Sequence, residues 1–184
     1  MNDQKIAIVT GANRGIGKEI VYQLVEKGFK VISTGRSLSK LKLAFENADP
    51  NVILHELDVS SDKSCGIFEL FLKENYTKID VLVNNAGIMG NSAISTFDLQ
   101  QIEKVMDTNF HGSIRLSKIV YPFLNHSNDG RIINVSSGMG EIGGLNGSHA
   151  AYRLSKLALN GFTIMLANDI GNSKIKVNAM CPGW

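Results

Sequence analysis

Two side chains that could share a catalytic task, Tyr152 and Lys156, stand four residues apart. A helix is expected from about His149 to Asn168, and residues four apart on a helix project from the same face. A phenol with a pKa of about 10 is a poor acid at neutral pH, but a neighbouring ammonium stabilises the phenolate. The pair therefore predicts a tyrosine that donates a proton to a reacting oxygen. The alternative is an amphipathic surface pair without chemistry.

A glycine-rich turn, Thr10–Gly17 (TGANRGIG), follows the first predicted strand and opens the first predicted helix. Such a turn brings backbone N–H groups and a helix N-terminus against a pyrophosphate. A tight structural turn is the alternative, but the position between strand and helix favours a ligand. The ligand that this placement indicates is a dinucleotide.

The end of the second predicted strand indicates which dinucleotide the protein binds. An NAD site usually has an acid about 20 residues after the turn, where it binds the ribose 2′-hydroxyl. Here the segment Ser33–Ser37 (STGRS) carries no carboxylate. Arg36 and Arg14 could instead hold a 2′-phosphate, because guanidinium donors match phosphate oxygens. This favours NADP(H), with two solvated surface charges as the alternative.

These residues, with others further along, resemble the short-chain dehydrogenases/reductases. Thr10–Gly17 is similar to the TGxxxGIG motif of that family, Asn84–Gly87 to its NNAG motif and Tyr152–Lys156 to its YxxxK motif. Asn109, Ser137 and the Pro182-Gly183 pair follow in the expected order, and the resemblance extends from Lys5 to the last residue. The phrases GANRGIG, VLVNNAGI and VNAMCPGW are most similar to the carbonyl reductase branch, which reduces aldehydes, ketones and quinones with NADPH.

The resemblance implies a role for each candidate catalytic residue. Tyr152 would act as the general acid, its pKa lowered by the ammonium of Lys156 and by a cationic nicotinamide ring. Lys156 would also bind the nicotinamide ribose, Ser137 would hydrogen-bond the substrate carbonyl, and Asn109 would support a water-linked proton path to Lys156. Ser137 is preferred to Ser136 because the serine of the family is usually the second of such a pair, and strand alternation turns the two apart.

The resemblance also implies a binding site for the cofactor. Asp58 and Val59 would contact the adenine, although Asp58 could equally belong to a helix cap. The Asn85–Gly87 turn would lie under the adenosine ribose, and the Pro182-Gly183 pair would approach the nicotinamide. The predicted cofactor residues are Gly11, Asn13, Arg14, Gly15, Ile16, Gly17, Arg36, Asp58, Val59, Asn85, Ala86, Gly87, Tyr152, Lys156, Pro182 and Gly183.

Six apolar runs that alternate with helical patterns must position these residues. Alternation of this kind predicts parallel strands joined by right-handed crossovers, hence a Rossmann-type, doubly wound α/β sheet in one domain over residues 1–184. The last run is expected to be a fully buried strand. The predicted strands are Lys5–Thr10, Lys30–Thr34, Val52–Glu56, Ile79–Asn84, Arg131–Ser136 and Lys174–Met180. Further helices are expected from about Leu38, from about Ser61 and from near Phe97.

Composition narrows the class of partner. The 184 residues carry a formal net charge of +2, and the basic residues are scattered, which argues against a nucleic-acid partner. No apolar run approaches the length of a membrane span, which argues against a membrane partner. The cysteines, Cys65 and Cys181, and the four histidines lack metal-ligand spacing, so no metal site is expected. These features favour a cytoplasmic protein whose partner is a small molecule or another protein. The family resemblance implies a small-molecule carbonyl substrate.

Two further expectations concern the end of the chain and assembly. Family members continue past the position of Trp184 through a substrate-covering segment to a seventh strand, so we expect a C-terminally incomplete domain that lacks both. Monomeric carbonyl reductases carry a long insertion between the serine and the tyrosine, whereas Ser137 and Tyr152 are only 15 residues apart. We therefore expect a homodimer or homotetramer formed through the helices near 98–120 and 149–168.

Two other functions remain open. One is reduction of a 3-oxoacyl thioester or a hydroxysteroid on the same scaffold. The other is an NADP(H)-binding sensor or scaffold without turnover, against which the intact set of Asn109, Ser137, Tyr152 and Lys156 weighs. Met139, Ile142, Leu145 and Met180 could line a substrate pocket, and ordinary core packing explains them equally well.

Overall fold

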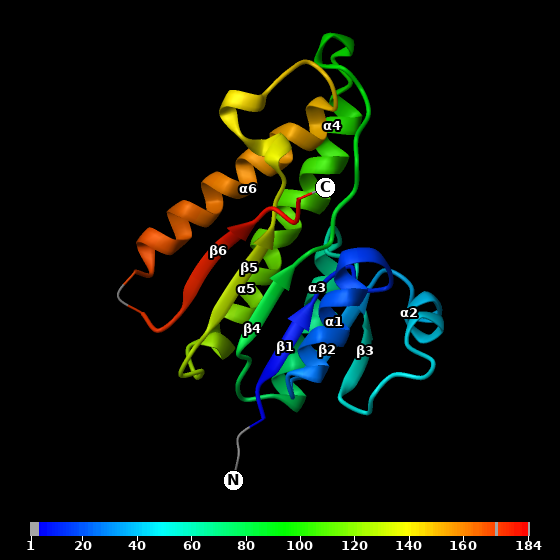
Figure 1. Cartoon of the computed structure of the whole chain (residues 1–184), viewed down its shortest axis with the longest axis vertical. Coiled ribbons are helices and arrows are strands. Elements are labelled where there is room, and N and C mark those ends of the chain that lie inside the picture. The colour runs from blue at the N-terminus through cyan, green and yellow to red at the C-terminus, as the bar shows by residue number, and fades with distance from the viewer. Residues whose placement is uncertain (1–3, 172, 184) are drawn as a thin grey trace.

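In a computed structural model, which describes residues 4–171 and 173–183, the chain forms a six-stranded parallel sheet (Figure 1). The strands lie in the order β3-β2-β1-β4-β5-β6, so the order reverses between β1 and β4. Ligands bind at the carboxyl ends of strands beside such a switch point. The strands are β1 (Ile6–Val9), β2 (Lys30–Gly35), β3 (Val52–Glu56), β4 (Val81–Asn84), β5 (Arg131–Val135) and β6 (Lys176–Met180). The predicted Rossmann-type α/β fold is confirmed.

Helices connect the strands and cover both faces of the sheet. Ser37, Ser61 and Asp98 cap three of the helices by accepting a backbone N–H three residues further on, as short polar side chains at this position do. The helices are α1 (Gly15–Glu26), α2 (Leu38–Ala44), α3 (Asp62–Asn75), α4 (Leu99–Met106), α5 (Gly112–Leu124) and α6 (Ala150–Asp169). Short 3₁₀ turns span Ile94–Thr96, Gly138–Gly140 and Ile142–Gly144.

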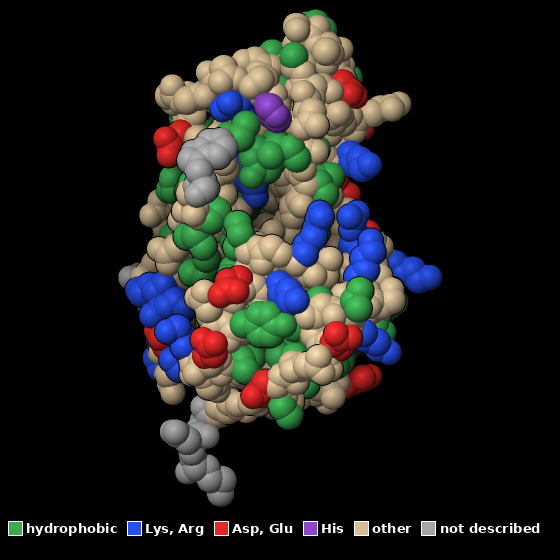
Figure 2. Space-filling model, turned by 45° about the vertical axis from the view of Figure 1, so that its right-hand side comes forward, with side chains coloured by type: hydrophobic (Ala, Val, Ile, Leu, Met, Phe, Trp, Pro, Cys, Tyr) green, Lys and Arg blue, Asp and Glu red, His purple; other side chains and the backbone are tan. Residues whose placement is uncertain are grey.

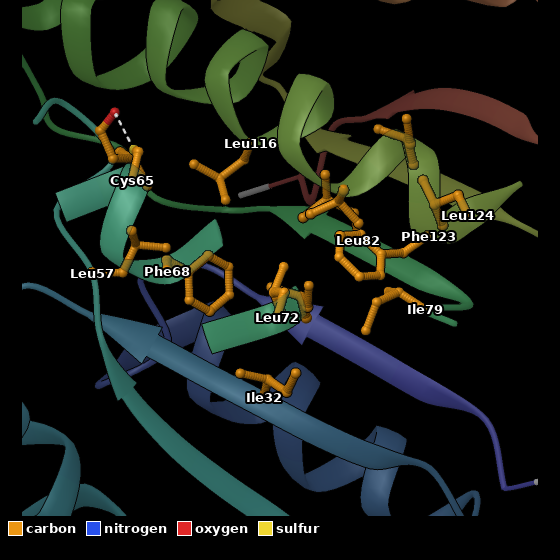
Figure 3. Packing of buried hydrophobic residues seen from close by; sticks show 14 of the residues in the cluster. Ile32, Leu57, Cys65, Phe68, Leu72, Ile79, Leu82, Leu116, Phe123 and Leu124 are labelled. Atoms are coloured by element: carbon orange, nitrogen blue, oxygen red, sulfur yellow. Dashed lines mark hydrogen bonds between the residues drawn. The ribbon is translucent and has the colours of Figure 1, made fainter. Parts of the chain in front are cut away.

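Alternate residues of the central strands build a core on each face. Ile8 and Leu82 face a cluster that includes Phe68 of α3 and Leu116 of α5, which Figure 3 shows from close by. The residues between them, such as Val9, face a second cluster against α1 and α2. Burial on both faces is why these strands are nearly continuous apolar runs.

The predicted strands agree with the observed ones to within two residues at each end, but the burial predicted for the last strand is wrong. β6 pairs with β5, and no other described strand lies on its far side. Of its five residues only Val177 is buried. An edge strand is covered by neighbours on one side only, so a run of apolar residues does not guarantee burial.

The helix expected from near Phe97 begins at Leu99 and continues to Leu124 with an interruption. Phe97 itself adopts a left-handed backbone conformation with φ of 49° and ends the preceding 3₁₀ turn. Between α4 and α5, Asp107–His111 form a π-helical turn. Such turns are rare and occur mostly at functional sites. This turn carries Asn109.

Two observations concern membrane-spanning helices and disulfide bonds. Among the described residues, no helix has both the length and the apolar character that crossing a membrane requires. Cys65 is buried and Cys181 exposed, and neither forms a disulfide.

Candidate active site

A cavity of about 490 Å³ lies at the carboxyl ends of β1, β2 and β4, where the strand order reverses. It brings together the glycine-rich turn, Arg36, the Asp58-Val59 pair and the Asn85–Gly87 turn, all of which were predicted. Its lining residues are Gly11, Asn13, Arg14, Gly15, Ile16, Gly17, Gly35, Arg36, Leu57, Asp58, Val59, Asn85, Ala86, Gly87, Ile88 and Thr108. Figure 2 shows a hollow in the molecular surface with hydrophobic side chains on one side and Lys and Arg side chains on the other.

Glycine is required in the turn for steric reasons. Gly11 and Gly15 have φ values of 64° and 55°, which other residues rarely adopt. A Cβ on Gly17 would lie 2.4 Å from Nδ2 of Asn85 and 2.7 Å from the carbonyl oxygen of Gly11. The turn therefore packs directly against the loop that follows β4, and its backbone stays accessible from the cavity.

Hydrogen bonds lock the turn to that loop. The Thr10 hydroxyl accepts from the backbone N–H groups of Asn85 and Ala86, each at 3.0 Å. In return, Nδ2 of Asn85 donates to the carbonyls of Thr10 and Gly11 at 2.8 and 3.2 Å. The NNAG motif thus holds the shape of the glycine-rich turn.

The two predicted phosphate ligands, Arg14 and Arg36, are exposed and both line the cavity. The nearest acid in the sheet register is Glu56, which stands opposite Gly35. Its carboxylate accepts the backbone N–H of Leu38 at 3.0 Å, and Glu56 does not line the cavity. At the end of β2, therefore, the cationic side chain of Arg36 and not the carboxylate of Glu56 lines the cavity.

Asp58 belongs to the turn that precedes α3 and also lines the cavity. Its Oδ1 accepts from the backbone N–H and the hydroxyl of Ser60, at 3.0 and 2.6 Å, which stabilises the turn before α3. Asp58 also lines the cavity, next to Val59, which is buried against Gly112. This wall of the cavity is therefore built on the turn between β3 and α3.

Lys156 is almost fully buried, with 4% of its surface exposed. Its Nζ lies 5.6 Å from the centre of the Tyr152 ring and donates to the carbonyl oxygen of Val135 at 2.7 Å. Burial lowers the pKa of Lys156 to about 8, because a desolvated ammonium is less stable than a hydrated one. One face of α6 thus carries both residues of the YxxxK motif, as their spacing predicts.

Tyr152 is partly buried beside Ser137. Burial raises the pKa of the phenol, and a side-chain hydrogen bond with Ser137 acts in the opposite direction. The expected lowering relied on Lys156 and on a cationic nicotinamide ring together. In the protein alone the pKa of Tyr152 is raised instead, because desolvation prevails while Nζ of Lys156 is directed to Val135.

The structure separates the two candidate serines. Ser136 is buried and its hydroxyl donates to Oδ1 of Asn160 at 2.6 Å. Ser137 is less buried, and its hydroxyl both contacts Tyr152 and accepts the N–H of Met139 at 3.2 Å. The alternation expected at the end of a strand therefore directs Ser137, and not Ser136, toward the tyrosine.

Asn109 lies fully buried on the π-helical turn. Its side chain accepts from the N–H of Ile88 at 2.8 Å and donates to the carbonyl of Ile88 at 2.9 Å and to the Ser155 hydroxyl at 3.0 Å. Ser155 in turn donates to the carbonyl of Tyr152 at 2.7 Å. Asn109 thus ties the loop after β4 to the helix that carries Tyr152.

Gly87 lies between the cavity and the predicted catalytic residues. It lines the cavity, and a Cβ on it would lie 3.4 Å from Oδ1 of Asn109 and 3.8 Å from Nζ of Lys156. The predicted cofactor-binding residues and the predicted catalytic residues therefore meet at this glycine.

Some predicted residues lie elsewhere. Pro182 and Gly183 are exposed and do not line the cavity. The segment that carries them still passes the Ser137 loop, since Sγ of Cys181 accepts the N–H of Gly138 at 3.2 Å. Ile142 is 78% exposed, which excludes core packing for that residue.

Sequence reasoning missed several residues of the site. Ile88 and Thr108 line the cavity, as do Gly35 and Leu57. Each of them is the chain neighbour of a predicted site residue, and this adjacency could have indicated it. Ser155 was also missed, although it stands directly before Lys156 within the YxxxK motif. In the described part of the chain, no three His, Cys, Asp or Glu side chains are grouped so that they could hold a metal ion.

Comparison with known proteins identifies the family. The short chain dehydrogenase family model matches residues 5–184. The 3-oxoacyl-[acyl-carrier-protein] reductase FabG of Vibrio cholerae is 34% identical over 98% of this chain and 73% of its own length. The Sniffer protein of Caenorhabditis elegans, a proposed carbonyl reductase, is 32% identical with a TM-score of 0.89, over 98% of this chain and 84% of that one. The RhlG/NADP complex of Pseudomonas aeruginosa is 31% identical with a TM-score of 0.90, over 97% and 72%.

The match spans almost the whole chain and includes the turn, the NNAG loop and the YxxxK helix described above. This protein belongs to the short-chain dehydrogenase/reductase family of oxidoreductases.

Proposed function

We propose that this protein reduces the carbonyl group of a small molecule to an alcohol with NADPH. The observation that carries the proposal is the meeting of Ser137, Tyr152, Lys156 and Asn109 beside Gly87, the residue shared with the dinucleotide cavity. A binding protein without turnover has no need to place an acid, a second hydroxyl and a buried lysine together at the end of that cavity.

The roles of the side chains follow from their positions. NADPH, when bound, supplies the hydride that adds to the carbonyl carbon. The hydroxyls of Ser137 and Tyr152 both orient the carbonyl oxygen, and Tyr152 gives it the proton that completes the alcohol. The ammonium of Lys156 stabilises the resulting phenolate, since opposite charge favours the ionised form. Because the pKa of the phenol is raised in the protein alone, Tyr152 needs this stabilisation to release its proton.

Arg14 and Arg36 support NADPH rather than NADH as the donor. Both line the cavity, and neither guanidinium group forms a hydrogen bond or ion pair with another described residue. Guanidinium groups without a protein partner are available to a phosphate on the ribose. The NADP-bound RhlG structure among the similar proteins agrees with this choice.

The substrate has two candidate classes. Similarity to Sniffer favours an aldehyde, ketone or quinone, the substrates of carbonyl reductases. Similarity to FabG favours a 3-oxoacyl thioester. The exposed apolar residues near Ser137, such as Ile142, fit the hydrophobic part of either class. We propose a carbonyl reductase, with the thioester reductase as the second candidate and a hydroxysteroid as a further substrate on the same scaffold.

A substrate panel tests the proposal. NADPH oxidation is measured with a quinone, an aromatic aldehyde, acetoacetyl-CoA and a 3-oxosteroid, each against the Tyr152→Phe variant as the control. Turnover with the quinone or aldehyde that the variant loses supports the carbonyl reductase. Turnover with acetoacetyl-CoA alone supports the second candidate. Tight NADPH binding without turnover of any compound would indicate a sensor.

Assembly and location belong to the same proposal. We propose a homodimer or homotetramer, because a groove of about 340 Å³ between α5 and α6 exposes apolar side chains, including Phe162 and Leu166, on the predicted interface. We also propose a cytoplasmic location, which the two unpaired cysteines favour.

A further inference from the structure

Arg115 on α5 contacts three segments that are distant from it in the sequence or lie on another turn of the chain: those of Val59, Asp62 and Asp107. Its Nε donates to Oδ1 of Asp62, the first residue of α3, at 2.5 Å. Its Nη1 donates to Oδ1 of Asp107, the first residue of the π-helical turn, at 2.8 Å. The same Nη1 lies 3.4 Å from the carbonyl oxygen of Val59. With the backbone carbonyl of Asp107, 3.5 Å from Nη1, one guanidinium therefore contacts two carboxylates and two backbone carbonyls.

The contacted segments form the site. Val59 lines the cofactor cavity, and so does Thr108, which directly follows Asp107. The next residue is Asn109, whose side chain holds Ile88 and Ser155. Arg115 thus lies behind the wall of the cavity. It connects Val59, at the proposed adenine end, with the π-helical turn that carries Asn109.

A π-helical turn needs support from its surroundings because it is less favourable than an α-helix. The side chain of Arg115 is only 25% exposed and that of Asp107 36%, so water screens their ion pair less than it would on an open surface. His111 adds a weaker contact, with Nδ1 at 3.6 Å from Oδ1 of Asp107. A planar guanidinium can bind both carboxylates in fixed directions, whereas a lysine ammonium is a single point charge.

We propose that Arg115 is a positioning residue: it holds the π-helical turn against Val59 and so fixes Asn109 for the proton path to Lys156. The inference rests on the proposed function for its kinetic part only. Its structural part, that Arg115 holds the turn, stands on the distances above.

The structural part is tested by amide hydrogen exchange. In Arg115→Met the amides of Asp107–His111 are expected to exchange about tenfold faster, as loss of a charge-assisted hydrogen bond predicts. The matched control is Arg131→Met, because Arg131 is a similarly exposed arginine paired with Asp129 at the other end of the sheet. It should leave exchange of the turn unchanged. Equal exchange in Arg115→Met and the wild type would overturn the proposal.

The kinetic part is tested by a double-mutant cycle with Asn109→Ala. Arg115→Met should lower kcat about tenfold with little change in KM for the carbonyl substrate, and Arg115→Lys should recover part of the loss. In the Asn109→Ala background, Arg115→Met should cause no further loss, because the residue that it positions is already gone. An equal loss of kcat in both backgrounds would mean that Arg115 acts by general stability, and would overturn the proposal.

If Arg115→Met fails to fold, Asp107→Asn replaces it in both experiments and removes the same ion pair. The failure of the proposed function is distinguishable: a wild-type protein that reduces no carbonyl compound refutes the function, while hydrogen exchange still decides whether Arg115 holds the turn.

Discussion

The ammonium nitrogen of Lys156 lies over the ring of Tyr152, 5.6 Å from its centre, while it donates to the carbonyl of Val135 at 2.7 Å. The last residue of β5 thus fixes the lysine against the tyrosine. An ammonium has three donors, so this bond leaves two for a ribose or a water. Sheet and helix together, rather than the helix alone, position the proposed acid and its charge partner.

The pKa of Lys156 predicts how stability depends on pH. The pKa falls from 10.5 to about 8 in the folded protein. Below pH 8 both states are protonated and the buried charge opposes folding; between pH 8 and 10.5 the unfolded chain binds more protons, so stability rises with pH. The free energy of unfolding of the wild type relative to Lys156→Met should rise by on the order of 3 kcal/mol across this range.

Denaturant unfolding of the cofactor-free protein at several pH values measures this difference. Lys118→Met, at an exposed lysine of α5, is the control and should follow the wild type. Parallel curves for the wild type and Lys156→Met would contradict the lowered pKa.

Arg36 is predicted to determine cofactor preference. A charge-assisted contact to the 2′-phosphate is worth about 1.5–3 kcal/mol, so Arg36→Ala should weaken NADPH binding roughly tenfold to a hundredfold. NADH lacks that phosphate and its affinity should change little. Titration of the variant with both cofactors makes the comparison, and an equal loss for both would refute the phosphate contact.

Gly17 is predicted to tolerate no side chain. In Gly17→Ala the new methyl would overlap Nδ2 of Asn85 and the carbonyl of Gly11, at a cost of about 1–3 kcal/mol and with loss of NADPH binding. Gly66→Ala is the control, because Gly66 lies in α3 with open space around it. That variant should be more stable by about 0.5–1 kcal/mol. Thermal unfolding of both proteins checks the contrast.

Assembly is predicted to depend on the outer face of α6. Met165 is 72% exposed on the predicted interface, so Met165→Glu should weaken the oligomer without disturbing the core. Leu43 on α2 is equally exposed, and Leu43→Glu should leave assembly unchanged. Light scattering at micromolar concentration measures both variants. A wild type that is monomeric there would refute the interface.

Much of the fold could be predicted because strands buried on both faces have a nearly continuous apolar sequence. The same rule failed for β6, because its apolar residues are interrupted by Lys176 and Asn178 and an edge strand leaves such side chains exposed. The π-helical turn at Asp107–His111 could not be predicted, because no residue type marks a change in backbone hydrogen bonding within a helix. Tertiary packing, not local propensity, places Asn109.

The candidate site was predictable where its residues form a local motif. The turn at Thr10–Gly17 and the Tyr152–Lys156 helix are of this kind. Arg115 was not, because its partners Asp62 and Asp107 come from separate elements and only the folded chain brings them together. Burial of Tyr152 could not be predicted for a related reason: the sequence does not show it. In the protein alone it raises the pKa of the phenol and outweighs the hydrogen bond with Ser137.

Replacement of Tyr152 by phenylalanine tests the central claim most directly. The variant keeps the ring beside Lys156 and removes only the proton donor. We predict that steady-state NADPH oxidation with a carbonyl substrate falls by about 10²–10⁴, while NADPH affinity measured by fluorescence stays that of the wild type. Turnover close to the wild-type rate, with intact cofactor binding, would contradict Tyr152 as the general acid and with it the proposed mechanism.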